Sequence, residues 1–226
     1  MESTNKSIAI VLLSGGMDSA VCAALAAEHG YELAALHLNY GQRTQSKELE
    51  CFSQLCTDLN INRKLVVDVG YLSQIGGSSL TDFEMEILPS TLGTGEIPNT
   101  YVPFRNANIL AIAVSWAEVI DASAIYIGAM EQDSSGYPDC RASFFAAFQA
   151  TVNLGTKTGS NIRIITPIID MKKSDIVIHG LRHGIDFSHT WSCYKSSDIA
   201  CGKCESCQLR LRGFKEAGVS DTLSYM

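Results

Sequence analysis

The chain alternates short apolar runs with longer segments in which apolar residues recur every three or four positions. The apolar runs are rich in β-branched residues, as buried strands are, and cover residues 8–13, 33–38, 65–69, 124–127 and 162–165. Helical periodicity follows at residues up to 28, then at 46–59, 107–120, 142–154 and 174–183. Strands that alternate with helices in this way predict an α/β fold, a doubly wound parallel five-stranded sheet with helices on both faces.

The stretch SGGMDS, residues 14–19, joins the first predicted strand to the first predicted helix. Its two glycines let the backbone curl, so that N–H groups and the positive end of the helix can face a phosphate. It lacks both the Lys-Ser/Thr ending and the three-glycine spacing of the two common phosphate motifs. A tight turn capped by Asp18 or Ser19 is the alternative. Its position after the first strand, where parallel sheets bind ligands, favours a nucleotide-binding loop.

Residues 70–103 form a long connection that is rich in Gly, Ser and Thr and has no strong periodicity. Connections between helices and strands are usually much shorter, and long ones are often functional. We interpret this segment as a substrate loop or lid.

Composition narrows the function. At 226 residues with 46% hydrophobic residues, the chain fits one α/β domain with a small appendage. The net charge of -7 argues against broad binding of nucleic acid and favours a small-molecule substrate. No stretch approaches the roughly 18 consecutive apolar residues of a membrane helix, and the first residues do not resemble a signal peptide. We therefore expect a cytoplasmic protein with neither a nucleic-acid nor a membrane partner.

The cysteines cluster near the C-terminus, where four of the eight lie within fifteen residues: Cys193, Cys201, Cys204 and Cys207. Four thiolates at this spacing can complete a tetrahedral zinc site and leave no coordination position open for chemistry. A disulfide pair or an iron–sulfur cluster would also use clustered thiolates. We expect one structural zinc ion per subunit, in a C-terminal zinc-binding segment and helix over residues 185–226 that follows a domain over residues 1–184.

Four polar strings lie outside the predicted core: HLNYGQR from His37, VPFRN from Val102, SGYPDCR from Ser135 and TPIIDMKK from Thr166. Each contains an Arg or Lys just after a predicted strand or at a helix start, where cations clamp phosphate or carboxylate groups. Any one string could be a capped turn with a solvated charge. Together the four strings indicate an anionic substrate.

These motifs carry a resemblance. SGGMDS resembles the SGGxDS pyrophosphate loop of the N-type ATP pyrophosphatases, also called the PP-loop superfamily. Five later strings are similar to those of the 7-cyano-7-deazaguanine synthase family, and the similarity covers about residues 8–214. They are YGQR, VPxRN, SGYPDCR, TWSCY and CGxCxSCxLR. The resemblance implies ATP-dependent conversion of 7-carboxy-7-deazaguanine and ammonia into 7-cyano-7-deazaguanine in queuosine biosynthesis. The intermediates would be an adenylated acid, an amide and an adenylated amide, and the subunits would form a homodimer.

The resemblance also implies roles for single residues. Asp18, Arg105 and Lys173 would be catalytic, with Asp18 orienting Mg²⁺ and Lys173 neutralising charge on the transferring phosphorus. Asp139 would read an edge of the deazaguanine. Phe104 stands where the family pattern suggests a small residue. The ATP-binding residues would be Leu13, Ser14, Gly15, Gly16, Met17, Asp18, Ser19 and Ala20. The substrate-binding residues would be Arg105, Asn106, Asp139 and Arg141, and the zinc ligands Cys193, Cys201, Cys204 and Cys207.

Three other functions share the loop. A tRNA thiolase of the same superfamily would expect a basic surface or an RNA-binding domain, whereas this chain is acidic. An ammonia-dependent amidotransferase such as an NAD synthetase would not need the cysteine cluster. A nucleotide-binding sensor would have kept the loop without catalysis. The sequence contains no glutaminase domain, so ammonia would come from solution or from a partner.

Overall fold

The computed structural model describes residues 6–89, 96–131 and 136–226. Within these residues, five strands form one parallel sheet in the order β3-β2-β1-β4-β5. The strands are β1 (Ile8–Leu12), β2 (Glu32–Asn39), β3 (Arg63–Asp68), β4 (Ala122–Ile127) and β5 (Arg163–Ile165). The predicted doubly wound α/β fold is confirmed.

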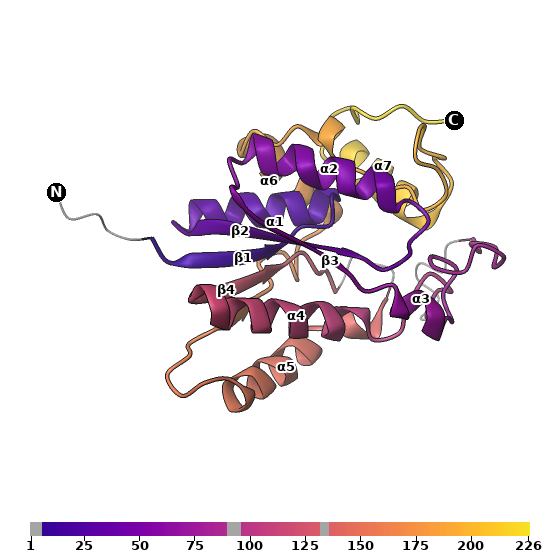
Figure 1. Cartoon of the computed structure of the whole chain (residues 1–226). Coiled ribbons are helices and arrows are strands. Elements are labelled where there is room, and N and C mark those ends of the chain that lie inside the picture. The colour runs from indigo at the N-terminus through magenta and orange to yellow at the C-terminus, as the bar shows by residue number, and fades with distance from the viewer. Residues whose placement is uncertain (1–5, 90–95, 132–135) are drawn as a thin grey trace.

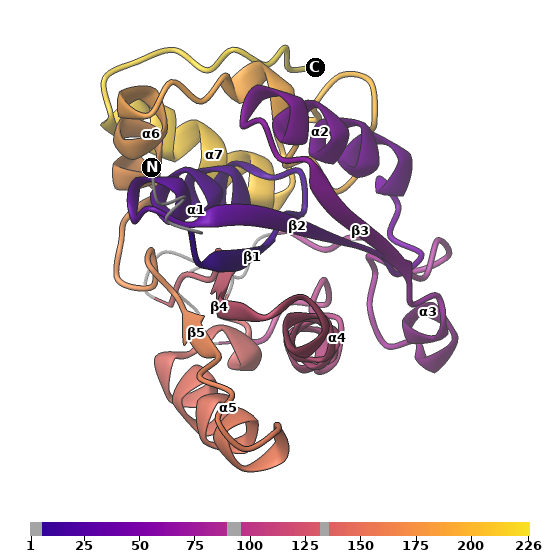
Figure 2. The ribbon, with the colours of Figure 1, turned by 60° about the vertical axis from the view of Figure 1, so that its left-hand side comes forward.

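Helices cover both faces of the sheet, as Figures 1 and 2 show. One face carries α1 (Met17–Glu28), α2 (Gln45–Asp58), α6 (Lys173–Arg182) and α7 (Glu205–Glu216). The other carries α4 (Arg105–Ile120) and α5 (Ala142–Gly155). The short helix α3 (Tyr71–Ile75) lies in the predicted long connection and was not expected from the sequence. Among the described residues, no helix combines the length and the apolar character that crossing a bilayer requires.

Strand β1 shows why the central strands read as continuous apolar runs. Ala9 and Val11 belong to the core cluster beneath α1 and α6, whereas Ile10 and Leu12 belong to the cluster against α4 and α5. Successive side chains of a strand point to opposite faces, and here both faces are covered. Every second residue therefore needs to be apolar on each face, and no polar alternation remains.

The chain runs from β1 outward to β2 and β3, and then returns to β4 on the other side of β1. The crevice between the carboxyl ends of β1 and β4 is therefore the place where ligands bind in such sheets. Gly128, directly after β4, lies close to the first turn of α1. A Cβ at this position would meet main-chain atoms of Asp18 and Ser19 at 3.0 Å. This contact holds the amino end of α1 at the crevice.

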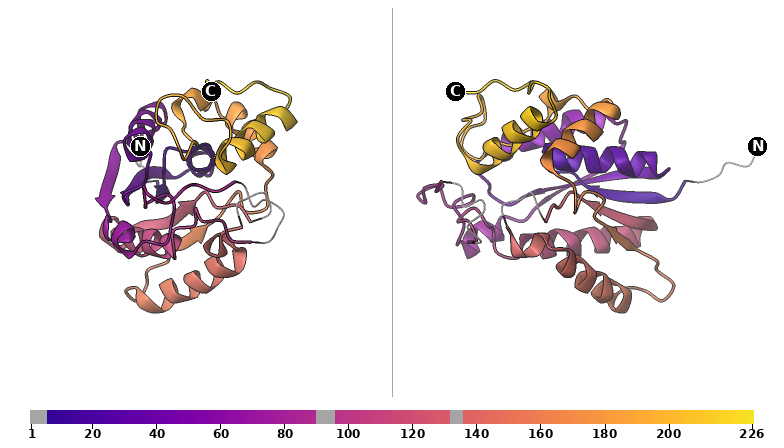
Figure 3. Two further views of the ribbon diagram at one scale, coloured as in Figure 1. Left: turned by 90° about the vertical axis from the view of Figure 1, so that its right-hand side faces the viewer. Right: turned by 180° about the vertical axis from the view of Figure 1, so that it is seen from behind.

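The C-terminal segment lies on the same side of the sheet as α2 and α6, and is drawn in yellow in Figure 3. Helix α7 packs against α6. Gly213 allows this approach, because a Cβ there would lie 2.7 Å from the Cγ atom of Lys173 and 3.0 Å from its carbonyl oxygen. The boundary expected at residue 184 falls just after α6 and stays a prediction.

Candidate active site

The loop between β1 and α1 is ordered by its own two serines. Ser19 Oγ donates to the Gly16 carbonyl at 2.9 Å and accepts from the Ser14 N–H at 3.2 Å. Ser14 Oγ accepts from the Gly16 N–H at 3.3 Å. Gly16 caps α1 without a side-chain acceptor, so the helix itself offers first-turn N–H groups to an anion.

Gly15 is packed between two other parts of the chain. Its φ of +89° is in the left-handed region, and a Cβ there would lie 2.5 Å from the carbonyl oxygen of Glu48 in α2. The Gly15 carbonyl accepts a hydrogen bond from the Trp191 N–H at 2.9 Å. The loop therefore takes its shape partly from α2 and partly from the TWSCY segment.

Lys173 and Asp18 form an ion pair at the loop. Lys173 Nζ donates to both carboxylate oxygens of Asp18 at 2.8 Å, and also contacts Met130 Sδ at 3.5 Å. Lys173 is the first residue of α6 and is only 7% exposed. A cation is disfavoured at the positive end of a helix, so the Asp18 carboxylate stabilises it there.

Arg105, the first residue of α4, lies against the ring of Tyr40. Its Nη1 donates to Tyr40 Oη at 3.0 Å, and its guanidinium carbon is 5.3 Å from the ring centroid. Burial alone would lower the pKa of Arg105, but the acidic groups of Tyr40, Tyr137, Cys140 and Asp139 raise it overall. The guanidinium therefore keeps its charge although the residue is half-buried.

Asp139 and Asn106 bond to each other across the start of α4. Asp139 Oδ2 accepts from the Asn106 N–H at 2.9 Å, and Asn106 Nδ2 donates to the Asp139 carbonyl at 2.9 Å and to Cys140 Sγ at 3.3 Å. Burial raises the pKa of Asp139, although the Asn106 N–H and Arg105 act against the rise. In this structure the Asp139 carboxylate caps α4, and its expected contact with substrate stays a prediction.

A cavity of about 270 Å³ opens between the loop, α4, α6 and the C-terminal segment. Most of the site residues expected from the sequence line it: Leu13, Ser14, Gly16, Met17, Asp18, Ser19, Arg105, Asn106 and Lys173. A larger depression of about 780 Å³ lies where β2 and β3 begin. That end of a parallel sheet is opposite to the one that binds ligands, so we assign the site to the smaller cavity.

Four of the residues expected to bind ATP or substrate lie outside the cavity lining. Ala20 is in the core, Gly15 packs on α2, Asp139 caps α4, and Arg141 is exposed before α5. Phe104 also lies away from the cavity, with its ring 6.2 Å from that of Phe144. Ser135 of the SGYPDCR string lies outside the described residues.

Arg43 of the YGQR string has a different role from the one its position suggested. Its guanidinium donates to the carbonyls of Ser79, Asp82 and Met85 at 2.6–2.7 Å. It therefore fixes the connection after α3 and does not clamp a ligand. The described residues of 70–103 do not line the cavity, and the predicted lid function of this connection stays a prediction.

Further lining residues were not assigned a role from the sequence. Several belong to the quoted strings, namely Tyr40, Tyr137, Cys140, Trp191, Ser192, Tyr194, Leu209 and Arg210. Tyr137 Oη shares a hydrogen bond with Thr100 Oγ1 at 2.9 Å. Glu48 also lines the cavity, and no motif pointed to it, because a polar residue on an amphipathic helix normally faces solvent.

The four clustered cysteines converge in the structure. Their Sγ atoms all lie within 4.8 Å of one another and are buried, so the cluster could hold a metal ion. Backbone N–H groups of Lys195, Ser196 and Cys201 each donate to Cys193 Sγ at 3.4 Å. Hydrogen bonds from Cys204 and Cys207, and then those from the N–H groups of Cys201 and Lys195, lower the pKa of Cys193 despite its burial. N–H groups that point at sulfur stabilise the thiolates a metal requires.

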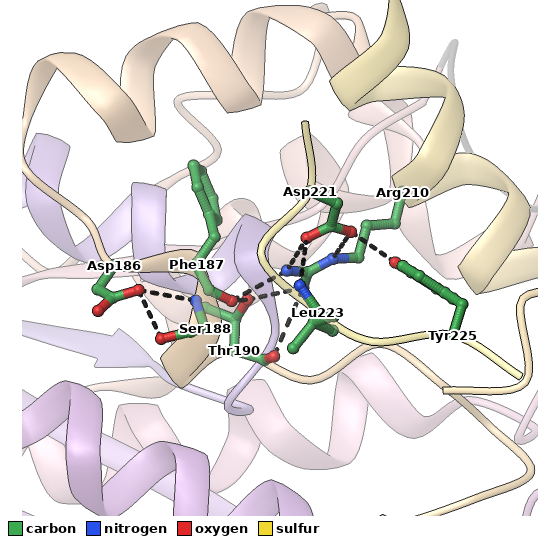
Figure 4. A network of polar contacts seen from close by, with 8 residues as sticks. All are labelled: Asp186, Phe187, Ser188, Thr190, Arg210, Asp221, Leu223 and Tyr225. Carbon is green, nitrogen blue, oxygen red and sulfur yellow. Dashed lines mark hydrogen bonds and ion pairs between the residues drawn. The ribbon is translucent and has the colours of Figure 1, made fainter. Parts of the chain in front are cut away.

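Arg210 ties the C-terminal segment together (Figure 4). Its Nε and Nη2 donate to the two carboxylate oxygens of Asp221 at 2.7 and 2.9 Å. Its Nη1 donates to Thr190 Oγ1 at 2.7 Å, and its Nη2 also donates to the Phe187 carbonyl at 2.9 Å. The guanidinium thus joins α7 to Asp221, near the end of the chain, and to Phe187 and Thr190, which shortly precede Trp191.

The fold and the loop define a class: a PP-loop α/β protein, with the SGGMDS loop at the switch point of the sheet. The crystal structure of a 4-thiouridine synthetase in complex with RNA and ATP has this fold, with a TM-score of 0.53 and 15% identity over 93% of this chain and 52% of that one. The family model of the queuosine biosynthesis protein QueC matches residues 8–218, and the chain belongs to this family.

Curated relatives agree with the family model. The 7-cyano-7-deazaguanine synthase of Chloroherpeton thalassium is 56% identical, and that of Chlorobaculum parvum is 54% identical. Each alignment covers 96% of this chain and 96% of the relative. The resemblance inferred from the motifs is confirmed.

Proposed function

We propose that this chain converts 7-carboxy-7-deazaguanine and ammonia into 7-cyano-7-deazaguanine at the expense of ATP. The name of its relatives gives the product, and the motif resemblance implies the acid, ammonia and ATP. One observation carries the proposal for this chain. One cavity is lined by the SGGMDS loop at the start of α1, the buried Lys173 and the half-buried Arg105. ATP and a carboxylate substrate are both anionic, and this cavity offers each of them a partner.

The reaction needs two activations because a carboxylate is a poor electrophile. In the first, a carboxylate oxygen attacks the α-phosphorus of ATP, pyrophosphate leaves and an acyl adenylate forms. Ammonia then attacks the acyl carbon, the bond to AMP breaks and the amide results. In the second, the amide oxygen takes an adenylyl group from another ATP. Loss of AMP and of the remaining N–H protons leaves the nitrile.

We assign different residues to the phosphates of ATP and to the carboxylate of the second substrate. Ser14, Ser19 and the first-turn N–H groups of α1 would hold the pyrophosphate, and Lys173 would stabilise charge on the α-phosphate. Arg105 would hold the carboxylate that is to be adenylated. Asp18 is the expected Mg²⁺ ligand, and the ion, when bound, would neutralise phosphate charge.

We propose zinc as the ion of the cysteine cluster. Four sulfur ligands within 4.8 Å of one another suit Zn²⁺, which would have a structural role because the ligand set is closed. Family resemblance supports a homodimer, and the reduced thiolates suit the cytoplasm. Size-exclusion chromatography with light scattering tests the oligomeric state, and metal analysis of the purified protein tests the ion.

The activity is tested by incubating the protein with ATP, Mg²⁺, ammonium and 7-carboxy-7-deazaguanine. Two molecules of AMP and two of pyrophosphate are expected for each nitrile, by mass spectrometry and a pyrophosphate assay. Pyrophosphate release that needs the deazaguanine acid separates this function from its rivals. Release with tRNA or with another acid in its place would contradict the proposal.

A further inference from the structure

Two carboxylate side chains line the described part of the cavity, those of Asp18 and Glu48. Lys173 binds both oxygens of Asp18, so that charge is paired. Glu48 differs, because no Lys, Arg or His among the described residues forms an ion pair with it. The cavity therefore contains one carboxylate whose charge is held by neutral groups.

The two oxygens of Glu48 are fixed separately. Thr44 Oγ1 donates to Oε1 at 2.7 Å, and Gln42 Nε2 donates to Oε2 at 3.0 Å. Thr44 and Gln42 are themselves only 3% and 4% exposed, so the donors have little room to move. An ionised carboxylate accepts about four hydrogen bonds, so each oxygen can still take a further donor from the cavity.

Glu48 and Arg105 are both near Tyr40. Gln42, which holds Glu48, accepts from the Tyr40 N–H at 2.9 Å, and the Tyr40 hydroxyl accepts from Arg105. Burial, with Glu48 contributing, raises the pKa of Tyr40 to about 12 despite Arg105. The neutral Tyr40 therefore links a carboxylate to the cation that we assign to the substrate's carboxyl group.

Building on the proposed function, we propose that Glu48 is the residue that binds ammonium and accepts its proton as the nitrogen attacks the acyl adenylate. Near neutral pH ammonia is mostly ammonium, which has no free electron pair. Arg105, Lys173 and Arg210 also line the cavity. Lys173 and Arg210 are paired with Asp18 and Asp221, so Arg105 is the cation that would repel ammonium. An unpaired carboxylate offsets this repulsion and attracts the ion to the acyl carbon.

The step balances without any further reactant except water. Ammonium gives one proton to Glu48, and the nitrogen lone pair forms the C–N bond. The carbon–oxygen bond to AMP breaks, AMP takes the electron pair, and the nitrogen passes a second proton to water to leave the amide. A positioned general base of this kind contributes about 10²–10⁴-fold to a rate.

The test compares Glu48→Gln with Glu50→Gln, a change at an exposed glutamate on the same helix whose side chain is 69% exposed. Adenylation is measured alone, as exchange of labelled pyrophosphate into ATP that depends on the deazaguanine acid in the absence of ammonium. Amide formation is then measured as a function of ammonium. We expect Glu48→Gln to keep the exchange rate and to lose about 100-fold in kcat/KM for ammonium. Glu50→Gln should keep both.

Hydroxylamine sharpens the test, because it is mostly uncharged near pH 7.5 and needs neither an anion to bind it nor a base to free its electron pair. Glu48→Gln should form the hydroxamate at nearly the wild-type rate. An unchanged ammonium dependence would overturn the proposal. An equal loss of exchange and amide formation would also overturn it, because Glu48 would then only stabilise the conformation of residues 40–44. Wild-type protein without acid-dependent exchange would overturn the proposed function as well.

Discussion

Gly15 and Gly30 have almost the same backbone conformation, with φ of +89° and +87°, but different surroundings. A Cβ on Gly15 would lie 2.5 Å from the Glu48 carbonyl oxygen, whereas one on Gly30 meets no described atom within 4 Å. Gly30 is needed for its conformation alone. Gly15 is needed in addition because α2 leaves no space beside the loop.

Substitution of Gly15, with Gly30 as the matched control, tests the steric argument for the loop. Gly30→Ala should cost about 1–2 kcal/mol in the free energy of unfolding, because an L-residue is strained at positive φ. Gly15→Ala should cost more, because its Cβ would also collide with the Glu48 carbonyl oxygen. Gly15→Ala must also displace the loop, so its Kd for a non-hydrolysable ATP analogue should rise at least tenfold, about 1.4 kcal/mol. Urea unfolding and isothermal titration calorimetry measure the two effects. Equal ATP affinity in both variants would contradict the steric argument.

Lys173 provides a second prediction at this scale. Lys173→Ala removes the buried cation next to the loop, and turnover should fall about 10²–10³-fold, as when a preorganised donor to the transition state is lost. The fold should persist, because the Asp18 carboxylate left behind keeps 30% side-chain exposure and can be solvated. Steady-state kinetics with circular dichroism checks both points. Lys157→Ala, at an exposed lysine, is the control, and near-normal turnover of Lys173→Ala would refute the assignment.

At the scale of elements, α7 is attached by a buried ion pair. The side chains of Arg210 and Asp221 are only 1% and 4% exposed. Burial would raise the pKa of Asp221, but the hydrogen bonds and charge of Arg210 outweigh it and lower the pKa below its usual value. Loss of one partner would leave the other charge buried and alone, which costs more than an exposed pair contributes.

Asp221→Asn should therefore lower the free energy of unfolding at pH 7 by about 3–5 kcal/mol. Because the folded-state pKa is depressed, the wild-type advantage is fully present above the unfolded-state value near ~4 and is lost as pH falls through the folded-state pKa. Urea unfolding at pH 7 and pH 3 measures this. Asp198→Asn, at an exposed position nearby, should differ little from wild type, and a gap that stays constant down to pH 3 would argue against the ion pair.

The strands and helices α3 and α7 show which features the sequence predicts and which it does not. The five strands were predictable because burial on both faces makes continuous apolar runs. Helix α3 was not, since five residues are too few to show a period. Arg210 and Glu205 read as polar positions of an amphipathic helix, yet they are 1% and 3% exposed. The partners of Arg210 lie 11 and 20 residues away in sequence, and a local pattern does not reveal such contacts.

For the candidate active site, the sequence predicted the segments but not the orientation of their side chains. The strings located the segments that meet at the cavity, because the carboxyl ends of parallel strands share one edge. They did not show which side chain of a segment faces inward. Arg43 and Arg105 both follow the expected pattern, but Arg43 bonds main-chain carbonyls while Arg105 lines the cavity. That difference depends on the conformation of residues 78–85, which local pattern does not fix.

At the scale of the whole molecule, the cysteine cluster is joined to the nucleotide loop. Trp191, two residues before Cys193, donates its N–H to Gly15, and Tyr194 donates its N–H to Cys204 Sγ at 3.5 Å while lining the cavity. The cluster therefore supports one wall of the cavity. If the proposed ion is structural, its removal should affect ATP binding through this wall.

Removal of the ion tests this coupling. The purified protein should contain one zinc ion per chain by mass spectrometric metal analysis, and a strong chelator should lower both the melting temperature and the affinity for ATP. Cys204→Ser should do the same, because three sulfurs bind the ion more weakly and metal binding contributes to folding. Cys56→Ala is the matched control: it also removes a buried thiol, but on the core-facing side of α2, so it should cost stability and retain the ion. Chelation that removed the ion yet left both properties unchanged would show that the wall stands without it.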